Sequence, residues 1–203
     1  MTKSLLPFLE PGRIEAGCDE AGRGCLAGPV FASAVILPEG FFHPLLDDSK
    51  KLSEKKRILL RTFIEKEAKA WAVAKVSPKE IDEINILNAS ILAMHKAINA
   101  LSLIPEVLLI DGHRFNLYPG IPHSCEIKGD GRFMSIAAAS VLAKTHRDEY
   151  MGTLHQEYPL YGWIKNMGYP TKAHRKAVYE HGPTPYHRRS FRLLDEQIRF
   201  DFS

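Results

Sequence analysis

The sequence predicts an α/β fold with a small helical segment at its C-terminal end. Short runs of β-forming residues are interspersed with longer segments in which apolar residues recur at helical spacing. The length of 203 residues suits one compact domain with a modest appendage. From residue 158 onward, aromatic and basic side chains interleave. We therefore expect an α/β domain over residues 1–157 and a C-terminal helical segment over residues 158–203.

The first two β-forming runs cover residues 14–19 and 29–37. The glycine-rich segment Gly22-Arg23-Gly24 and the single Gly28 separate them, as turn residues separate the strands of a hairpin. This pattern predicts an antiparallel pair of strands.

A polar loop at residues 47–51 precedes the first expected helix. Ser53 has the residue type of a helix N-cap, because its hydroxyl can accept a hydrogen bond from a free amide of the first turn. The apolar residues that recur at helical spacing after it are Ile58, Leu59, Phe63 and Ile64. We expect this helix to be buried.

Residues 71–76 are rich in β-formers, and the segment Ser77-Pro78-Lys79-Glu80 then predicts a helix start. The segment supplies an N-cap serine, a proline at the first helical position and the glutamate of a capping box. The apolar residues that follow at spacings of three and four are Ile91, Met94, Ile98 and Leu101. We expect the helix to end near Leu103.

Two further runs predict strands that end in acids. The apolar run 107–110 reads as a fully buried strand and ends in Asp111-Gly112. A shorter run at 123–128 ends in Gly129-Asp130.

The rest of the chain reads as helical. Small residues at 135–143 permit close helix packing, and the helical pattern continues to Glu157 despite Gly152. A short helix is expected after Thr171.

Composition excludes several classes of protein. A hydrophobic fraction of 45% with 25% charged residues is typical of globular chains and not of disordered ones. A net charge of +3 is too small for a histone-like protein that binds nucleic acid by bulk charge, so any nucleic-acid site must be local.

Cysteine usage and hydropathy indicate a compartment. Cys18, Cys25 and Cys125 show neither the spacing of a disulfide framework nor a CxxC pair, which favours free thiols in a reducing environment. The N-terminus lacks the apolar core of a signal peptide, and no stretch reaches the ~20 apolar residues of a membrane span. We expect a soluble cytoplasmic protein that does not associate with membranes.

Four acids form the strongest candidate site: Asp19, Glu20, Asp111 and Asp130. Taken singly, each acid fits a turn, a helix cap or a surface ion pair. An ionised carboxylate that ends an apolar strand is costly, however, unless it is paired, hydrogen-bonded or bound to metal. The carboxyl ends of strands form the ligand crevice in mixed or parallel sheets, so these acids could converge.

Converging carboxylates repel one another unless cations neutralise them. Oxygen ligands without a matching Cys or His set select Mg²⁺ or Mn²⁺ over zinc. Two such ions can orient an attacking water and stabilise the leaving oxygen of a phosphodiester. The acids therefore predict a two-metal site for phosphoryl hydrolysis.

Two polar segments could bind phosphate. The turn Gly22-Arg23-Gly24 offers approachable backbone amides beside a guanidinium, although in isolation a plain glycine turn with a solvated arginine is the better explanation. The segment Ser49-Lys50-Lys51 suits either a phosphate backbone or an ordinary solvated loop.

Six separated blocks of the sequence carry a family resemblance. In chain order they are Cys18-Asp19-Glu20-Ala21-Gly22-Arg23-Gly24, Asp48-Ser49-Lys50-Lys51-Leu52-Ser53, Ile110-Asp111-Gly112, Lys128-Gly129-Asp130, Gly168-Tyr169-Pro170-Thr171 and His187-Arg188-Arg189-Ser190-Phe191. Together, over about residues 14–191, they resemble the bacterial ribonuclease HII family. The resemblance implies a ribonuclease-H-like mixed five-stranded sheet flanked by helices, with a C-terminal helical segment that helps to hold the duplex.

The same resemblance implies an activity and a substrate. The family hydrolyses the RNA strand of RNA/DNA hybrids and incises 5′ of single ribonucleotides embedded in duplex DNA, leaving 3′-hydroxyl and 5′-phosphate ends. The four acids named above match its metal-binding catalytic carboxylates. Excision repair and primer removal both remain open as the cellular duty.

Substrate-binding residues follow from the family pattern. Gly22, Arg23 and Gly24 would contact the 2′-hydroxyl and the neighbouring phosphate, and Tyr169 would stack on the sugar of the next deoxynucleotide. A fixed turn can read the 2′-hydroxyl without reading the base, so specificity would be for the sugar. Met167 stands where the family usually has Lys, and Lys165 lies two residues earlier. The resemblance therefore does not assign the basic contact of that Lys to a residue of this chain.

Further contacts and partners are hypotheses. Lys50, beside Ser49, and Lys128 would neutralise phosphate near the site. The tail at residues 197–202 faintly resembles a sliding-clamp-binding peptide, but it also fits a frayed helix end. We expect a monomer.

Two rival functions remain compatible with the residues. The acids would also fit a DNA-directed nuclease or integrase on the same scaffold, because a fold does not choose a substrate. A non-enzymatic hybrid-binding module is the other rival. It would be favoured if one of the four acids were missing, and none is.

Overall fold

The structure is a computed structural model that describes residues 5–46 and 53–194. The strands of its single sheet are β1 (Glu15–Ala21), β2 (Val30–Ile36), β3 (Ala70–Val76), β4 (Val107–Asp111) and β5 (His123–Glu126). The helices are α1 (Glu54–Glu67), α2 (Pro78–Asn99), α3 (Met134–Glu157), α4 (Trp163–Asn166) and α5 (Lys172–His181), with short 3₁₀ turns η2 (Gly129–Gly131) and η3 (Pro159–Tyr161).

The five strands form one mixed sheet in the order β3-β2-β1-β4-β5. The first three strands pair antiparallel, whereas β1 with β4 and β4 with β5 pair parallel. The sheet confirms the predicted antiparallel pair and the mixed five-stranded architecture. Because β1 lies at the centre, both kinds of pairing meet along it.

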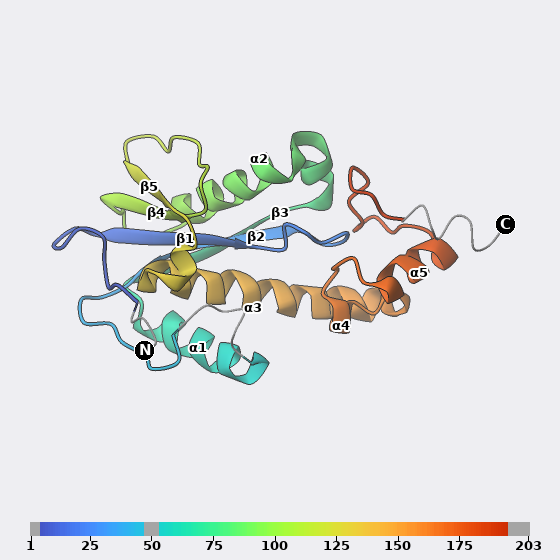
Figure 1. The fold of residues 1–203 in the computed structure, drawn as a ribbon, viewed down its shortest axis with the longest axis horizontal. Helices are drawn as coiled ribbons and strands as arrows, with labels where there is room; N and C mark the ends of the chain where they lie inside the picture. Colours follow the sequence, from blue (N-terminus) through green and yellow to red (C-terminus); the bar gives the residue numbers. More distant parts are fainter. Residues whose placement is uncertain (1–4, 47–52, 195–203) are drawn as a thin grey trace.

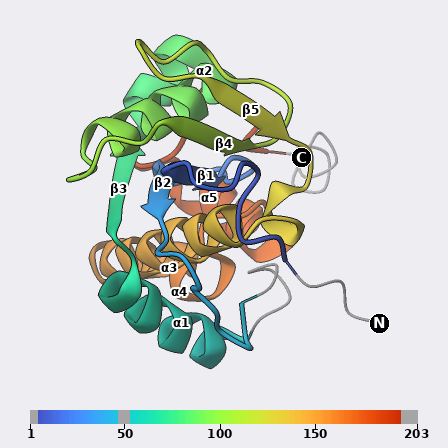
Figure 2. The same cartoon turned by 90° about the vertical axis from the view of Figure 1, so that its left-hand side faces the viewer.

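Helices cover both faces of the sheet (Figures 1 and 2). The helix α2 packs on one face, where its apolar side, including Ile81 and Met94, meets β1, β2 and β3. The long helix α3 packs on the other face, and α1 lies against α3. Burial on both faces explains why the five residues of β4 form an almost continuous apolar run.

The approach of α3 to the sheet is unusually close. A Cβ built on Gly17 of β1 would lie only 2.2 Å from the carbonyl carbon of Ser135. Ser33 of β2 donates to the carbonyl of Ala139 at 2.6 Å. The small residues at 135–143 therefore bring α3 onto the centre of the sheet, as the sequence predicts, and α3 continues through Gly152 to Glu157.

The predicted caps are present, but the buried face of α1 differs from expectation. Ser53 caps α1 by accepting from the amide of Lys56. Ile58 and Leu59 are 54% and 57% exposed, whereas Leu60 and Ile64 are fully buried. The prediction that Ile58 and Leu59 belong to a buried face is wrong, because α3 meets the neighbouring side of the helix.

The helix α2 starts where the capping box predicts and ends earlier than expected. Ser77 and Glu80 form the reciprocal capping contacts. Asn85 has φ +65°, which interrupts the helix, and its Oδ1 then accepts from the amide of Asn88 at 3.1 Å. The helix ends at Asn99, not near Leu103.

The C-terminal segment packs against the end of α3. Its cluster joins Trp163, Tyr161 and Val178 to Met151 of α3 and to Ala27 of the loop between β1 and β2. The helix expected after Thr171 is α5, and Thr171 caps it by accepting from the amide of His174. The division of the chain into 1–157 and 158–203 stays a prediction. No helix in the described part of the chain combines the length and the apolar character needed to span a bilayer.

Candidate active site

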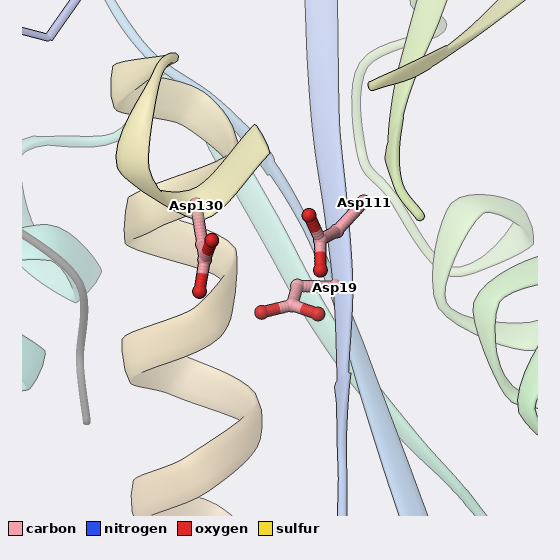
Figure 3. Close-up of side chains that lie close together, drawn as sticks. All are labelled: Asp19, Asp111 and Asp130. Atoms are coloured by element: carbon pink, nitrogen blue, oxygen red, sulfur yellow. The ribbon is translucent and has the colours of Figure 1, made fainter. Parts of the chain in front are cut away.

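Two of the four acids lie side by side because of the parallel pairing of β1 and β4. Cys18 of β1 is in register with Ile110 of β4. The next residue in each strand is an acid, so Asp19 and Asp111 adjoin at the carboxyl ends of neighbouring strands. Figure 3 shows their side chains directed into the same space.

Asp130 reaches this space from a turn and not from a strand end. The strand β5 stops at Glu126, and Asp130 sits in the 3₁₀ turn η2 that leads into α3. Lys128, with φ +55°, reverses the chain before the turn. The expectation that Asp130 terminates a strand is therefore wrong, although its carboxylate still meets the other two.

The three aspartates form a compact, partly buried group. One carboxylate oxygen from each of Asp19, Asp111 and Asp130 lies within 4.8 Å of the others. Asp19 and Asp130 are 4% and 6% exposed. Burial raises the pKa of the Asp19 carboxyl well above its usual range, and the charges of Glu20 and Asp111 raise it further, against a hydrogen bond with Ser140. The group carries an electrostatic cost that a cation would remove.

Glu20 does not join the three aspartates at that distance in the described structure. Successive residues of a strand point to opposite faces, so Glu20 is directed away from the α3 side that Asp19 faces. Its Oε1 accepts from Arg23 at 3.0 Å. Glu20, Arg23 and Asp111 border a small hollow against α2, which His113 and Arg114 also line.

The donor set fits a divalent cation. The three aspartates offer only carboxylate oxygens, which Mg²⁺ and Mn²⁺ prefer to the sulfur and nitrogen donors that favour zinc. Their convergence within 4.8 Å is a separation that one shared ion can bridge.

The glycine-rich turn after β1 is tightly constrained. Gly22 has φ +95°, and a Cβ there would lie 2.0 Å from Nε of Arg147. A Cβ on Gly24 would meet no atom within 4 Å, so this side of the turn is open. Arg23 is free to pair with Glu20 at the edge of the site.

Tyr169 lies beside the segment that follows this turn. The amide of Leu26 donates to the carbonyl of Gly168 at 2.8 Å. Tyr169 is 41% exposed, and its hydroxyl contacts the buried thiol of Cys25. An aromatic ring is therefore available to solvent near the glycine turn.

None of the three cysteines forms a disulfide, as predicted.

The structure describes only some of the expected basic contacts. Lys128 is exposed next to η2. Met167 has φ +48°, and its carbonyl accepts from Arg147 at 2.9 Å. Ser49, Lys50 and the 197–202 tail lie outside the described residues.

Sequence reasoning gave no role to two arginines behind the glycine turn. Arg147 and Arg188 are 1% and 0% exposed, which is rare for a charged side chain. The sequence offered only weak signals for them. Arg147 is a charged residue on the buried side of α3, and Arg188 belongs to one of the six blocks that carry the family resemblance, but no role was assigned to it.

Comparisons with known proteins agree with this architecture. The model of the family described as Ribonuclease HII matches residues 16–194. A Ribonuclease HII of Bacteroides thetaiotaomicron is 66% identical over 199 residues, which cover 98% of this chain and 100% of that protein.

Solved structures show the same fold. The ribonuclease H2 of Pyrococcus horikoshii has a TM-score of 0.75 and 26% identity, covering 93% of this chain and 99% of its own. The RNase HII of Archaeoglobus fulgidus, solved in complex with PCNA, has a TM-score of 0.74 and 27% identity, covering 93% and 100%. The predicted ribonuclease-H-like fold is confirmed.

Proposed function

The chain belongs to the ribonuclease HII family and is a ribonuclease-H-type endonuclease. From this premise we propose that it incises duplex DNA 5′ of a single embedded ribonucleotide and also cuts the RNA strand of RNA/DNA hybrids. The products would carry 3′-hydroxyl and 5′-phosphate ends. The observation that carries the proposal is the convergence of Asp19, Asp111 and Asp130 at the carboxyl ends of β1 and β4.

The family is metal-dependent, and the three aspartates form a group that can hold a metal ion. We propose Mg²⁺ or Mn²⁺ as the ion and a pair of ions as the working state. Two such ions would activate the attacking water and stabilise the leaving oxygen. Asp19, Asp111 and Asp130 would hold them, and Glu20, which borders a hollow together with Asp111, would be the fourth ligand.

Recognition of the sugar would fall to the glycine turn. Gly22, Arg23 and Gly24 would contact the 2′-hydroxyl and its phosphate, and the open space beside Gly24 supports a close approach. Tyr169 would stack on the next deoxynucleotide, since much of its ring is exposed. Lys50 and Lys128 would attract the phosphate backbone.

One experiment tests this function against both rivals. Labelled duplex DNA with one ribonucleotide and the matched all-DNA duplex are incubated with and without divalent metal, and the cut is mapped to the nucleotide. We expect one metal-dependent cut on the 5′ side of the ribonucleotide. Equal cutting of the all-DNA duplex would favour a DNA-directed nuclease, and metal-independent binding without product would favour a binding module.

Partner and location extend the proposal. A sliding clamp is a candidate partner through residues 197–202, and a relative from Archaeoglobus fulgidus was solved in complex with PCNA. A clamp pull-down that deletion of residues 197–203 leaves unchanged would remove this partner. A monomeric state and a cytoplasmic location stay predictions.

A further inference from the structure

Arg188 is a fully buried side chain that holds the glycine turn from behind. Its Nη2 donates to the carbonyl of Gly22 at 2.7 Å and its Nη1 to the carbonyl of Arg23 at 2.9 Å. Its Nε donates to the carbonyl of Gly28 at 3.0 Å. One guanidinium therefore fixes two consecutive peptide groups of the turn and the segment just before β2.

These bonds set the direction of the amides on the other side of the turn. In a trans peptide the carbonyl and the following N–H point in opposite directions. Because the carbonyls of Gly22 and Arg23 point at Arg188, the amides of Arg23 and Gly24 point away from it. Neither amide donates to a backbone carbonyl of the described residues. The turn thus presents two donors on the side opposite Arg188, and the space around Gly24 is open.

A second buried arginine limits movement of the turn. The side chain of Arg147 fills the space that a Cβ on Gly22 would occupy. It donates to the carbonyls of Ala27 and Pro29, both at 3.2 Å. Both guanidinium groups pack against the turn, so its peptide planes have little freedom to rotate.

Arg188 is itself held by contacts on both sides along the chain. Its amide donates to the carbonyl of Leu26 at 2.8 Å. The amides of Arg189 and Ser190 both donate to Asp82 of α2 at 2.9 Å. Thr184 donates its amide to Nδ1 of His187 at 2.9 Å. The C-terminal segment therefore delivers the guanidinium to a fixed position.

The burial of Arg188 is costly, which argues for a specific role. Desolvation lowers the pKa of Arg188 to about 10, so the group stays charged at neutral pH. A buried cation without excellent geometry is destabilising compared with an apolar side chain. A positive charge behind a peptide group also polarises it and strengthens its N–H as a donor.

We propose that Arg188 is a positioning residue for ribonucleotide recognition, which aims the amides of Arg23 and Gly24 at the 2′-hydroxyl and the adjacent phosphate. The inference rests on the proposed function, because it assigns the sugar selectivity of that site to the C-terminal segment. Arg188 contacts no substrate in this scheme and acts only through the turn.

The test measures a ratio of two affinities. Fluorescence anisotropy gives the Kd for a duplex with one ribonucleotide and for the matched all-DNA duplex, with Ca²⁺ as the divalent ion and a gel check that both stay uncut. The ratio is insensitive to the folded fraction of a sample, because that fraction scales both apparent affinities equally. A purely structural role for Arg188 would leave it unchanged.

We expect the wild-type protein to prefer the ribonucleotide duplex and Arg188→Met to reduce this preference about fivefold or more, the effect of losing a hydrogen bond or two. All-DNA affinity should fall less, because that duplex keeps the phosphate but has no 2′-hydroxyl to lose. The matched control is Arg189→Met, which removes a charge from the exposed neighbouring position. Lost phosphate attraction there would weaken both affinities and leave the ratio as it was.

If Arg188→Met does not fold, the same ratio of affinities is measured in Arg188→Lys. Lysine keeps the charge but has one nitrogen in place of the three that reach three carbonyls, so the preference should again fall. An unchanged ratio in a folded Arg188 variant would overturn the inference while leaving the proposed function intact. A wild-type protein without any preference for the ribonucleotide duplex would overturn both.

Discussion

The amide of Gly129 donates to Oδ1 of Asp111 at 2.7 Å, which ties the end of β4 to the turn that carries Asp130. The two residues are 18 positions apart in the chain. Asp111 would therefore serve the candidate metal site twice, as a ligand and as the contact that places a second ligand.

Asp111→Asn should abolish metal-dependent incision while the fold and much of the duplex affinity persist. The asparagine oxygen can still accept from Gly129, but the ligand charge is lost. Calorimetry with Mn²⁺, a thermal melt and the incision assay check the three parts. Glu83→Gln, an exposed change on α2, is the control. Near-normal turnover of Asp111→Asn would refute the assignment.

Tyr169→Phe should retain most of the incision activity, whereas Tyr169→Ala should lose about 5- to 150-fold in kcat/KM. The proposed role needs only the face of the ring, and stacking on an aromatic side chain contributes about 1–3 kcal/mol. Steady-state cleavage of the single-ribonucleotide duplex measures both variants. Equal losses in the two would indicate that the hydroxyl contact with Cys25, and not stacking, is what matters.

Lys128→Asn should reduce the slope of log K against log salt concentration for duplex binding by about 0.9, as expected for one lost phosphate contact. Asparagine tolerates the left-handed backbone that Lys128 adopts, so stability should hardly change. Titrations at several salt concentrations give the slope. Lys66→Gln, at an exposed site at the end of α1, should leave it unaltered.

Lys50→Ala is the parallel change in the polar sequence segment that precedes α1. We expect weaker duplex binding, again with a slope smaller by about 0.9, and an unchanged cleavage position. Salt titrations and mapping of the cut measure the two effects. An unaltered salt dependence would argue that Lys50 is merely solvated.

Folding stability should fall as the pH drops from about 6.5 to about 4, in part because of His187. Burial and, to a lesser extent, the charge of the neighbouring His174 lower the pKa of His187 to about 4. Above pH 6.5 neither the folded nor the unfolded chain protonates this ring, so its contribution is complete. Between these values the unfolded chain takes up the proton first, and stability is lost.

Urea unfolding at pH 7 and pH 5 tests this account. In His187→Asn, whose side-chain oxygen can still accept from Thr184, the loss between the two pH values should be smaller than in the wild type. His113→Asn changes an exposed ring and should not alter the loss. Identical losses in His187→Asn and the wild type would mean that other groups carry the pH dependence.

Local signals in the sequence determined most of the secondary structure of this protein. The caps at Ser53, Ser77 and Thr171 were readable because a cap involves residues within one turn of each other. The strands could be predicted from their runs of β-forming residues, and the close packing of α3 could be predicted from its small residues. Where a choice depended on a distant partner, as at Ile58 and Leu59, periodicity could not decide which side of the helix would be buried.

Tertiary structure alone decided how the site is assembled. The parallel register of β1 and β4 sets Asp19 beside Asp111, and the alternation of strand side chains directs Glu20 to the other face. Arg188 meets Gly22 across 166 positions of the chain. Such contacts depend on how whole elements pack, which a short sequence pattern does not specify. The acids could therefore be predicted as candidates from the sequence. Their detailed arrangement and the role of Arg188 behind the turn could not.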